Sequence, residues 1–501
     1  MNMKKIIAAV LSAAIIGGAV PFSAAAEETG DGITVIDVAT SGKFGDISWM
    51  LDQQTGVLTI SGKGPVAYEG YSPWNDLHKE VTSIVVEEGI TSLPESVFSL
   101  CYAETIDLPS TLTEIQGEAL GFFGLTPKLT EIRVAEGNPA FVSADGVLFN
   151  KDMTTLLKYP VQKPDESYTV PEGVKSISAA AFLVQRYLRS VTLPEGLETI
   201  GEVAFYSCKQ IENIDIPESV TEIFGNAFPG TPWLAAKQAE DPLVIVNDIL
   251  VNGLAAEGKV IIPDNVRRIA PFSFENNENI TEVYLPCDAE SVGKSAFYHC
   301  TSLRKLDSGE VKEIDTLAFC GCSVLSEVTL YNTQKIGQYA FADCEKLHDI
   351  IIENPKCEIF DDPTTICSGG NEKDGYTFSG TICGLMGSTA LEYAKKYGYN
   401  YDELILPTTE YAGDVNYDDS VNLNDAVAIL QYTALPAKYG LSDGALIRAD
   451  VVDYCISGVN AADALAIMMV DAGVLAREDL PVSSERIFAK GNDTQQEKES
   501  E

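Results

Sequence analysis

The fold is decided by the stretch VAFYSCKQIENIDIPESVTEIFGNAF, residues 203–228. Ile214 and Ile216 alternate with polar residues, as in a strand that has one buried face. Pro217 ends that strand because proline cannot donate to a hydrogen-bond ladder. Ile223 belongs to a second apolar stripe further along the stretch. Such a unit cannot bury its apolar face alone, so the stretch predicts one coil of a stack.

Phenylalanine marks the period of this stack. From Phe182 onward the intervals between successive repeat phenylalanines are 23, 23, 46, 23, 22 and 22 residues, and 46 is two periods. The phenylalanines are Phe98, Phe182, Phe205, Phe228, Phe274, Phe297, Phe319 and Phe341. A period of about 20 to 29 residues predicts a leucine-rich-repeat solenoid with parallel strand ladders.

The shared pattern A-F-x-x-C-x-x-L-x-x-I-x-I-P-x-x-V-x-x-I resembles the BspA-like leucine-rich repeats of bacterial surface and secreted proteins, over about 81–400. The segments 145–160 and 247–263 look like the inserted hairpin of that family, and 387–399 looks like its terminal helix. Upstream, 47–65 alternates polar and apolar residues around a Gly-containing turn, which predicts a hairpin that caps the first coil.

The cysteines follow the repeat. Five of the eleven lie three residues after a repeat phenylalanine, so we expect them to be small buried core groups: Cys101, Cys208, Cys300, Cys322 and Cys344. Other coils place Gln185, Thr231 or Asn277 in this position. Outside it, Cys357, Cys367 and Cys383 cluster near the end of the array, where the sequence leaves one disulfide open.

Composition and motifs restrict the function. A formal net charge of −40 argues against nucleic-acid binding, which needs a basic surface. There is no nucleophile elbow, Walker loop or zinc-protease motif. The neighbours His299 and Cys300 are unsuited to a catalytic dyad, because adjacent residues rarely face each other. Aromatic residues such as Trp74 and Tyr71 allow sugar stacking, with packing in the core or cap as the simpler interpretation.

The N-terminus predicts export. Lys4 and Lys5 precede an apolar run from 6 to 20, and Ala24 to Ala26 offer a cleavage site. No second apolar run approaches the roughly 18 residues of a membrane span.

Near the C-terminus, GDVNYDDSVNLNDAVAILQY (413–432) has the spacing of a calcium loop followed by a helix. Calcium takes six to eight oxygen ligands, and positions 1, 3, 5, 7, 9 and 12 of such a loop supply them. Here these are Asp414, Asn416, Asp418, Ser420, Asn422 and Asp425. Asp replaces the usual Glu at position 12, and Asp419 stands where Gly normally makes the sharp turn.

The motif returns in altered form, since VNLNDAVAIL at 421–430 becomes VNAADALAIM at 459–468. In the second loop, 14 residues rather than 12 run from Asp450 to Asp463. Val452 and Tyr454 stand at positions 3 and 5 in simple register, with Asp453 as a substitute if the loop bulges. Asn460 matches position 9 counted back from Asp463. The sequence leaves open whether calcium occupies this loop.

A calcium loop with one helix, duplicated within 411–476, resembles a type I dockerin. The resemblance implies that calcium folds the module and that its two helices bind a cohesin domain of a scaffoldin. Loop positions 10 and 11 and the next helical turn would form the contact: Leu423, Asn424, Val427, Ala461, Ala462 and Leu465.

We therefore expect a mostly β repeat solenoid with a capping hairpin and helix, followed by a small all-α calcium-binding dockerin. The expected parts are a signal peptide (1–26), an N-terminal β capping region (27–80), the solenoid (81–400), a linker (401–410), the dockerin (411–476) and a disordered tail (477–501). The expected function is that of a secreted, non-catalytic component of a cellulosome-like assembly, held at the cell surface through a scaffoldin. Its solenoid would display a surface for an unknown protein or glycan. The alternatives are an adhesin for host, microbial or plant-wall polymers and, less favoured, a polysaccharide-degrading enzyme.

Overall fold

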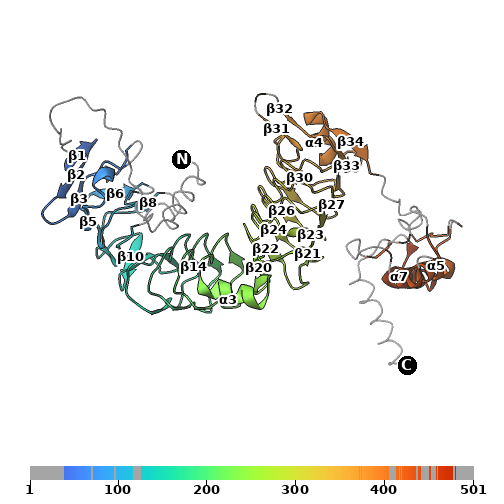
Figure 1. The fold of residues 1–501 in the computed structure, drawn as a ribbon, viewed down its shortest axis with the longest axis horizontal. Helices are drawn as coiled ribbons and strands as arrows, with labels where there is room; N and C mark the ends of the chain where they lie inside the picture. Colours follow the sequence, from blue (N-terminus) through green and yellow to red (C-terminus); the bar gives the residue numbers. More distant parts are fainter. Residues whose placement is uncertain are drawn as a thin grey trace. The chain divides into compact units, whose positions relative to one another are not determined.

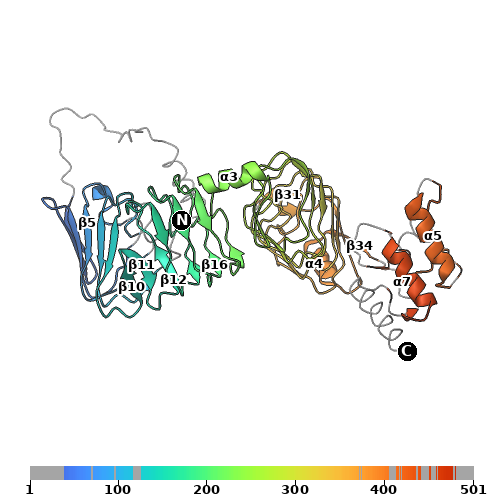
Figure 2. The same ribbon diagram turned by 90° about the horizontal axis from the view of Figure 1, so that it is seen from below.

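The computed structural model describes residues 39–68, 72–94, 97–116, 126–371, 373, 375–404, 413–416, 418, 420–435, 438–441, 449, 451–452, 459, 461–477 and 480. The chain divides into two units, Met1–Ala236 and Lys237–Glu501. The division falls inside the range predicted for the solenoid. Figures 1 and 2 show short strands that repeat from coil to coil within each unit. The predicted signal peptide lies outside the described residues.

The first unit begins with an antiparallel cap that continues into a parallel ladder. Its sheet has the order β1-β2-β3-β5-β7-β9. The strands are β1 (Ser41–Phe44), β2 (Ile47–Asp52), β3 (Val57–Gly62), β5 (Ser83–Val86), β7 (Thr105–Leu108) and β9 (Glu131–Val134). β2 and β3 pair antiparallel, and β3 pairs parallel with β5. The predicted capping hairpin is therefore confirmed.

Aromatic packing closes this cap. Trp74, beside the short 3-10 helix η1 (Asn75–Leu77), is fully buried. Its ring meets that of Trp49 edge-on at 6.0 Å between centroids, and its Nε1 donates to the carbonyl of Val97 at 3.2 Å. Trp74 thus packs in the core and is not available to a sugar; Tyr71 lies outside the described residues.

The remaining sheets of the first unit consist of short strands. One sheet runs β10 (Phe141–Ala144), β11 (Val147–Asn150), β12 (Thr155–Lys158), β14 (Ser176–Ile177), β16 (Thr199–Ile200) and β18 (Glu222–Ile223). Two smaller sheets are β13 (Ser167–Thr169), β15 (Ser190–Thr192) and β17 (Asn213–Asp215), and β4 (Gly64–Pro65), β6 (Ile90–Leu93) and β8 (Glu114–Ile115). The strands of these sheets pair parallel except for the antiparallel pairs β10–β11 and β11–β12. The helix α3 (Pro232–Glu240) follows.

The second unit repeats this plan. Its longest sheet runs β19 (Val244–Val246), β20 (Ile249–Asn252), β22 (Arg268–Ile269), β24 (Ser291–Val292), β26 (Glu313–Ile314), β28 (Lys335–Ile336) and β30 (Glu358–Ile359). A second ladder holds β21 (Gly258–Ile261), β23 (Ile280–Tyr284) and β25 (Lys305–Asp307). A third holds β27 (Glu327–Leu330), β29 (Asp349–Ile352), β33 (Thr381–Gly384) and β34 (Asn400–Glu403), and β31 (Gly369–Asn371) pairs with β32 (Gly375–Thr377).

The two predicted insertions differ. In the first, β11 and β12 pair antiparallel within 145–160, as predicted. In the second, β20 pairs antiparallel with β19, which precedes the predicted range 247–263, while β21 joins β23 in a parallel ladder. The second prediction was therefore wrong in its pairing, because β21 has the alternating pattern of a coil strand.

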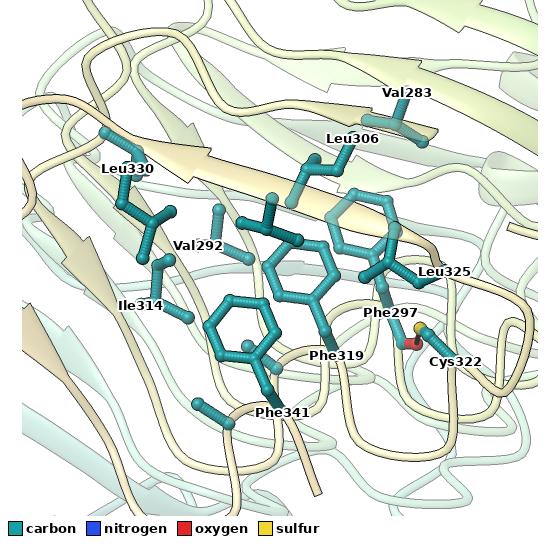
Figure 3. Close-up of a cluster of buried hydrophobic side chains, with 14 of the residues drawn as sticks. Val283, Val292, Phe297, Leu306, Ile314, Phe319, Cys322, Leu325, Leu330 and Phe341 are labelled. Atoms are coloured by element: carbon teal, nitrogen blue, oxygen red, sulfur yellow. Dashed lines mark hydrogen bonds between the residues drawn. The ribbon is translucent and has the colours of Figure 1, made fainter. Parts of the chain in front are cut away.

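The repeat phenylalanines stack along the core, and Figure 3 shows three of them in the second unit. Phe297 and Phe319 have centroids 5.0 Å apart and ring planes 3° apart, and Phe319 and Phe341 are 5.4 Å and 5° apart. All three side chains are fully buried. Stacking at nearly the spacing of strands in a sheet, about 4.8 Å, joins each coil to the next.

The cysteine position is a hydrogen-bond donor position. Four of the five thiols donate to the carbonyl of the phenylalanine one coil earlier: Cys208 to Phe182 at 2.9 Å, Cys300 to Phe274 at 3.2 Å, Cys322 to Phe297 at 3.2 Å and Cys344 to Phe319 at 3.4 Å. Where Gln185 or Asn277 takes this position, its side-chain amide donates to carbonyls of the preceding coil. The prediction of buried cysteines is confirmed, and the donor role is additional.

The chain turns through left-handed backbone on both sides of each phenylalanine. Two residues after it, φ is positive at Val184, Ser207, Asn276, His299 and Asp343, with values from 55° to 60°. The backbone N–H groups of this turn continue the ladder between coils; for example, Val184 donates to the carbonyl of Tyr206. Asn and Asp tolerate this conformation better than β-branched residues do.

The predicted terminal helix is confirmed as α4 (Thr389–Tyr397). Ser388 caps it by accepting from the N–H of Leu391, and Gly398 ends it with φ 71°. Its buried residues Ala390 and Tyr393 join the core of the second unit, so the helix covers the last coil. Nearby, none of the thiols of Cys357, Cys367 and Cys383 is in a disulfide.

Two helices follow near the C-terminus, α5 (Leu423–Ala434) and α7 (Ala461–Asp471). They pack side by side, as Figures 1 and 2 show. Ala426, Ile429, Ala464 and Ile467 form the centre of a separate small apolar core between them. In the described part of the chain, no helix has the length and apolar character needed to cross a bilayer.

Candidate functional site

The first predicted loop closes on the buried carboxylate of Asp425. Its Oδ1 accepts from the N–H groups of Val415 (2.8 Å) and Asn416 (3.1 Å), and its Oδ2 accepts from the N–H of Asn422 (3.0 Å). Asn422 in turn caps α5, since its Oδ1 accepts from the N–H of Asn424 at 2.9 Å. One aspartate therefore ties the start of the loop to the start of the helix.

The other predicted ligands form a chain of turns within the loop. Asp414 is fully buried and its Oδ1 accepts from the N–H of Asp418 at 3.0 Å. The Oδ1 of Asn416 accepts from the same N–H at 2.9 Å, and its Nδ2 donates to Oδ2 of Asp418 at 3.0 Å. Asp418 accepts from the N–H of Ser420 at 3.0 Å. The loop thus brings Asp414, Asn416, Asp418 and Asp425 into one hydrogen-bonded network.

The electrostatics of this loop suit a cation. Burial raises the pKa of the Asp425 carboxyl, and the nearby charge of Asp414 raises it further, while the three backbone N–H groups lower it. Two buried carboxylates and an amide oxygen are hard oxygen donors of the kind that calcium takes. Within the described residues, no three Asp, Glu, His or Cys side chains are gathered as tightly as a metal centre requires. The chemistry of the donors fits calcium, while the side chains hold one another through hydrogen bonds.

The second loop keeps the buried aspartate at its end, which we call the anchor, and differs from the first loop in several other residues. Asp463 is fully buried, and its Oδ1 accepts from the N–H groups of Val451 and Val452, each at 2.8 Å. This matches Asp425 with Val415 and Asn416. The other predicted ligands, Asp450, Asp453 and Asn460, lie outside the described residues.

The predicted partner-binding residues are mostly exposed on the two helices. On α5, Leu423 is 50% exposed and Val427 40%, with Asn424 exposed beside them. On α7, Ala461 and Leu465 are exposed. Ala462 is the exception, since it is half-buried against the core of the helix pair.

Sequence reasoning missed two further exposed residues of these helices. Leu430 is 42% exposed and Met468 is 41% exposed, one helical turn beyond Val427 and Leu465. Each helix thus carries an exposed stripe at spacing i, i+4, i+7, and the two stripes are related residue by residue through an offset of 38. That offset was visible in the duplicated sequence. We call Leu423, Val427, Leu430, Ala461, Leu465 and Met468 the paired stripes.

The Cys300 thiol and two carboxylates of the solenoid have structural roles. The Cys300 thiol donates to the carbonyl of Phe274, and burial raises its pKa to about 12. The Glu88 carboxylate accepts from the N–H and hydroxyl of Ser110, and Asp361 pairs with Lys396 and Tyr397. Each of these groups ties one segment of a coil or cap to another.

Comparison with known proteins places the solenoid in a family. A profile described as "BspA type Leucine rich repeat region" matches in six copies, at residues 77–139, 163–235 and 256–363. No enzyme family was found, and a search of curated proteins gave no match.

Solved structures match as well. A leucine-rich repeat protein from Eubacterium ventriosum is 21% identical, with 58% of this chain and 89% of that chain covered and a TM-score of 0.30. A leucine rich cell surface protein from Faecalibacterium prausnitzii is 18% identical, with 67% and 99% covered and a TM-score of 0.31. The pneumococcal vaccine antigen PcpA is 17% identical, with 74% and 100% covered and a TM-score of 0.22. The repeat profile shows that residues 77–139, 163–235 and 256–363 of this chain are BspA-type leucine-rich repeats.

Proposed function

We propose that this chain is a secreted, non-catalytic binding protein of a cellulosome-like assembly. Its C-terminal helix pair is a dockerin that binds a scaffoldin cohesin in the presence of calcium and so holds the chain at the cell surface. The solenoid displays a surface for a protein or glycan ligand. The proposal goes beyond the family match, whose residues end at 363.

The observation that carries the docking role is the pair of equivalent apolar stripes. Five of their side chains are large, and each of these is between 39% and 50% exposed. They occupy a helix pair whose own core is small. Contiguous exposed apolar side chains on a soluble domain are typical of protein-binding surfaces. Each stripe begins two residues before the anchoring aspartate of its loop, so a cation in a loop would set the position of the stripe that begins there.

The test is calorimetric titration of the full secreted chain with a panel of cohesins, in calcium and in EDTA. We expect binding in calcium and its loss in EDTA. The double variant Val427→Glu/Leu465→Glu places a charge on each stripe, and burying an unpaired charge should weaken binding by about tenfold or more. Ile261→Glu is the matched control, because Ile261 is 63% exposed but lies on the solenoid. Binding that survives the double variant, or no binding to any cohesin, would refute the docking role.

A second candidate function, adhesion, rests on the outer ladder of the first unit. In β13, β15 and β17 the residues that point outward are small and polar and stand in register: Ser167 with Ser190 and Asn213, and Thr169 with Thr192 and Asp215. Such a flat set of hydroxyl, amide and carboxyl groups suits hydrogen bonding to a polymer. A glycan and protein array probed with the full chain tests this role. Ligand binding that is lost in Thr192→Glu, without any cohesin binding, would favour a free adhesin.

A further inference from the structure

We infer that the C-terminal helix pair binds a single calcium ion, in the first loop, and that the second loop is a metal-free copy in which Val452 takes the place of a ligand. This inference rests on the proposed calcium-dependent docking function. It concerns the residues of this chain and departs from the two-ion expectation that the duplication suggests.

The hydrogen bonds of the two anchoring aspartates fix the register between the loops. Asp425 Oδ1 accepts from residues 415 and 416, and Asp463 Oδ1 accepts from residues 451 and 452, with all four distances between 2.8 and 3.1 Å. Val452 is therefore the structural equivalent of Asn416. Sequence spacing alone could not establish this, because the second loop has a different length.

The two equivalent residues have opposite environments. Asn416 is exposed, and its side-chain amide hydrogen-bonds within the loop to Asp418. Val452 is 1% exposed and belongs to the apolar core of the helix pair, together with Val451. A valine offers no oxygen to a cation that takes six to eight. Turning Val452 outward would remove it from that core and expose its apolar side chain to water.

The length of the second loop also argues against a calcium site there. Nine residue steps separate Asn416 from Asp425, whereas eleven separate Val452 from Asp463. The twelve-residue calcium loop depends on fixed spacing, since its ligands must converge on one point at about 2.3–2.6 Å. The second loop has two more residues in this interval, so its sequence does not keep the ligand spacing of the first loop.

The second anchor is also held by contacts within the chain. The Asp463 carboxylate accepts from the backbone N–H groups of Val451 and Val452. Val451 and Val452 pack in the apolar core of the helix pair, and this packing holds the start of the second loop in place where a cation would otherwise do so. The helix pair thus has one half organised around donor oxygens and one half organised around valines.

The test compares two equivalent substitutions in the full chain, Asp425→Asn and Asp463→Asn. Asparagine keeps the oxygen that accepts from the backbone and removes the charge. Chains stripped with chelator and returned to calcium are counted for bound ions by equilibrium dialysis and native mass spectrometry, with far-UV circular dichroism as the check on folding. We expect Asp425→Asn to bind one ion fewer than the wild type and Asp463→Asn to bind the same number.

A lost ion in Asp463→Asn would overturn the inference, and cohesin binding that remained calcium-dependent would leave the proposed function intact. No loss in either variant would overturn the inference together with the calcium role of the first loop. Anomalous scattering from calcium-soaked wild-type crystals is independent of the variants: one peak beside Asp414 and Asp425 supports the inference, and a peak beside Asp463 refutes it.

Discussion

Replacing Lys158 by methionine should change how the stability of the solenoid depends on pH. Lys158 ends β12 and is 2% exposed, and its Nζ donates to the carbonyl of Ala180 at 2.9 Å. Burial lowers the pKa of this ammonium group from 10.5 to about 8. The two pKa values correspond to a cost of about 3 kcal/mol for keeping the charged form in the folded state.

The direction of the pH dependence follows from proton binding. Between pH 8 and 10.5 the unfolded chain holds this proton and the folded chain has released it, so unfolding takes up a proton. The cost is complete below pH 8 and disappears as the pH rises to 10.5. Methionine has a similar length and no charge, but it leaves the Ala180 carbonyl without this donor, which costs about 1–3 kcal/mol at every pH. The free energy of unfolding of the variant minus that of the wild type should therefore fall by about 2–3 kcal/mol between pH 7 and pH 10.

Denaturant unfolding of both proteins at several pH values, with a reductant present, measures this difference. Groups common to both proteins cancel, including the thiols that ionise in the unfolded chain. The control is Lys209→Met, in which an exposed lysine of the same unit is replaced and no such trend is expected. A difference between the Lys158→Met variant and the wild type that stayed constant from pH 7 to pH 10 would refute the reasoning.

Two further predictions concern the repeat. Val184→Asn should raise the free energy of unfolding by about 1 kcal/mol, because a half-buried valine is held at φ 58°, in a position where another coil has Asn276 at φ 60°. The reverse change, Asn276→Val, should lower the free energy of unfolding. Denaturant titration of the two variants measures both changes, and changes that did not have opposite signs would contradict this prediction. Burial raises the pKa of the Cys300 thiol from 9.0 to about 12, so its contribution to stability is complete below pH 9 and is lost as the pH rises from 9 to 12. Cys300→Ser keeps a donor for the Phe274 carbonyl and should remove that part of the pH dependence, whereas a variant with an unchanged stability profile above pH 9 would show that the thiol does not titrate on unfolding.

The coil architecture could be predicted from the sequence because burial imposes it. Residues such as Ile214 and Ile223 must face inward at every turn, so their spacing repeats with the coil. The pairing of β20 could not be predicted, since either neighbouring segment has the alternation of a strand. The donor role of the cysteines could have been predicted from the sequence. Cys, Gln, Thr and Asn share the position three residues after the repeat phenylalanine, and all four side chains can donate a hydrogen bond. Buried size alone explains Cys but not Gln185.

The candidate site was predictable only where the spacing was regular. In the first loop the alternation of oxygen-bearing residues identified Asp414, Asn416 and Asp418, and the hydrogen bonds connect them. In the second loop the altered length leaves its alignment with the first loop open, and only the contacts of Asp463 fix which residues are equivalent. Lys158 shows another limit. Its place two residues after Leu156 indicates an inward side chain, and its charge indicates an outward one. Geometry decided between them, because the Ala180 carbonyl supplies a partner.

The thiols that donate to phenylalanine carbonyls bear on how the chain matures. Once neighbouring coils have stacked, a thiol such as Cys322 is fully buried and its pKa is raised well above the usual value, so little reactive thiolate forms. Before the coils stack, the same thiols are open to oxidants and to one another. Each completed coil that has a cysteine in this position therefore removes one sulfur from cross-linking, and fast addition of coils protects the chain from scrambled disulfides.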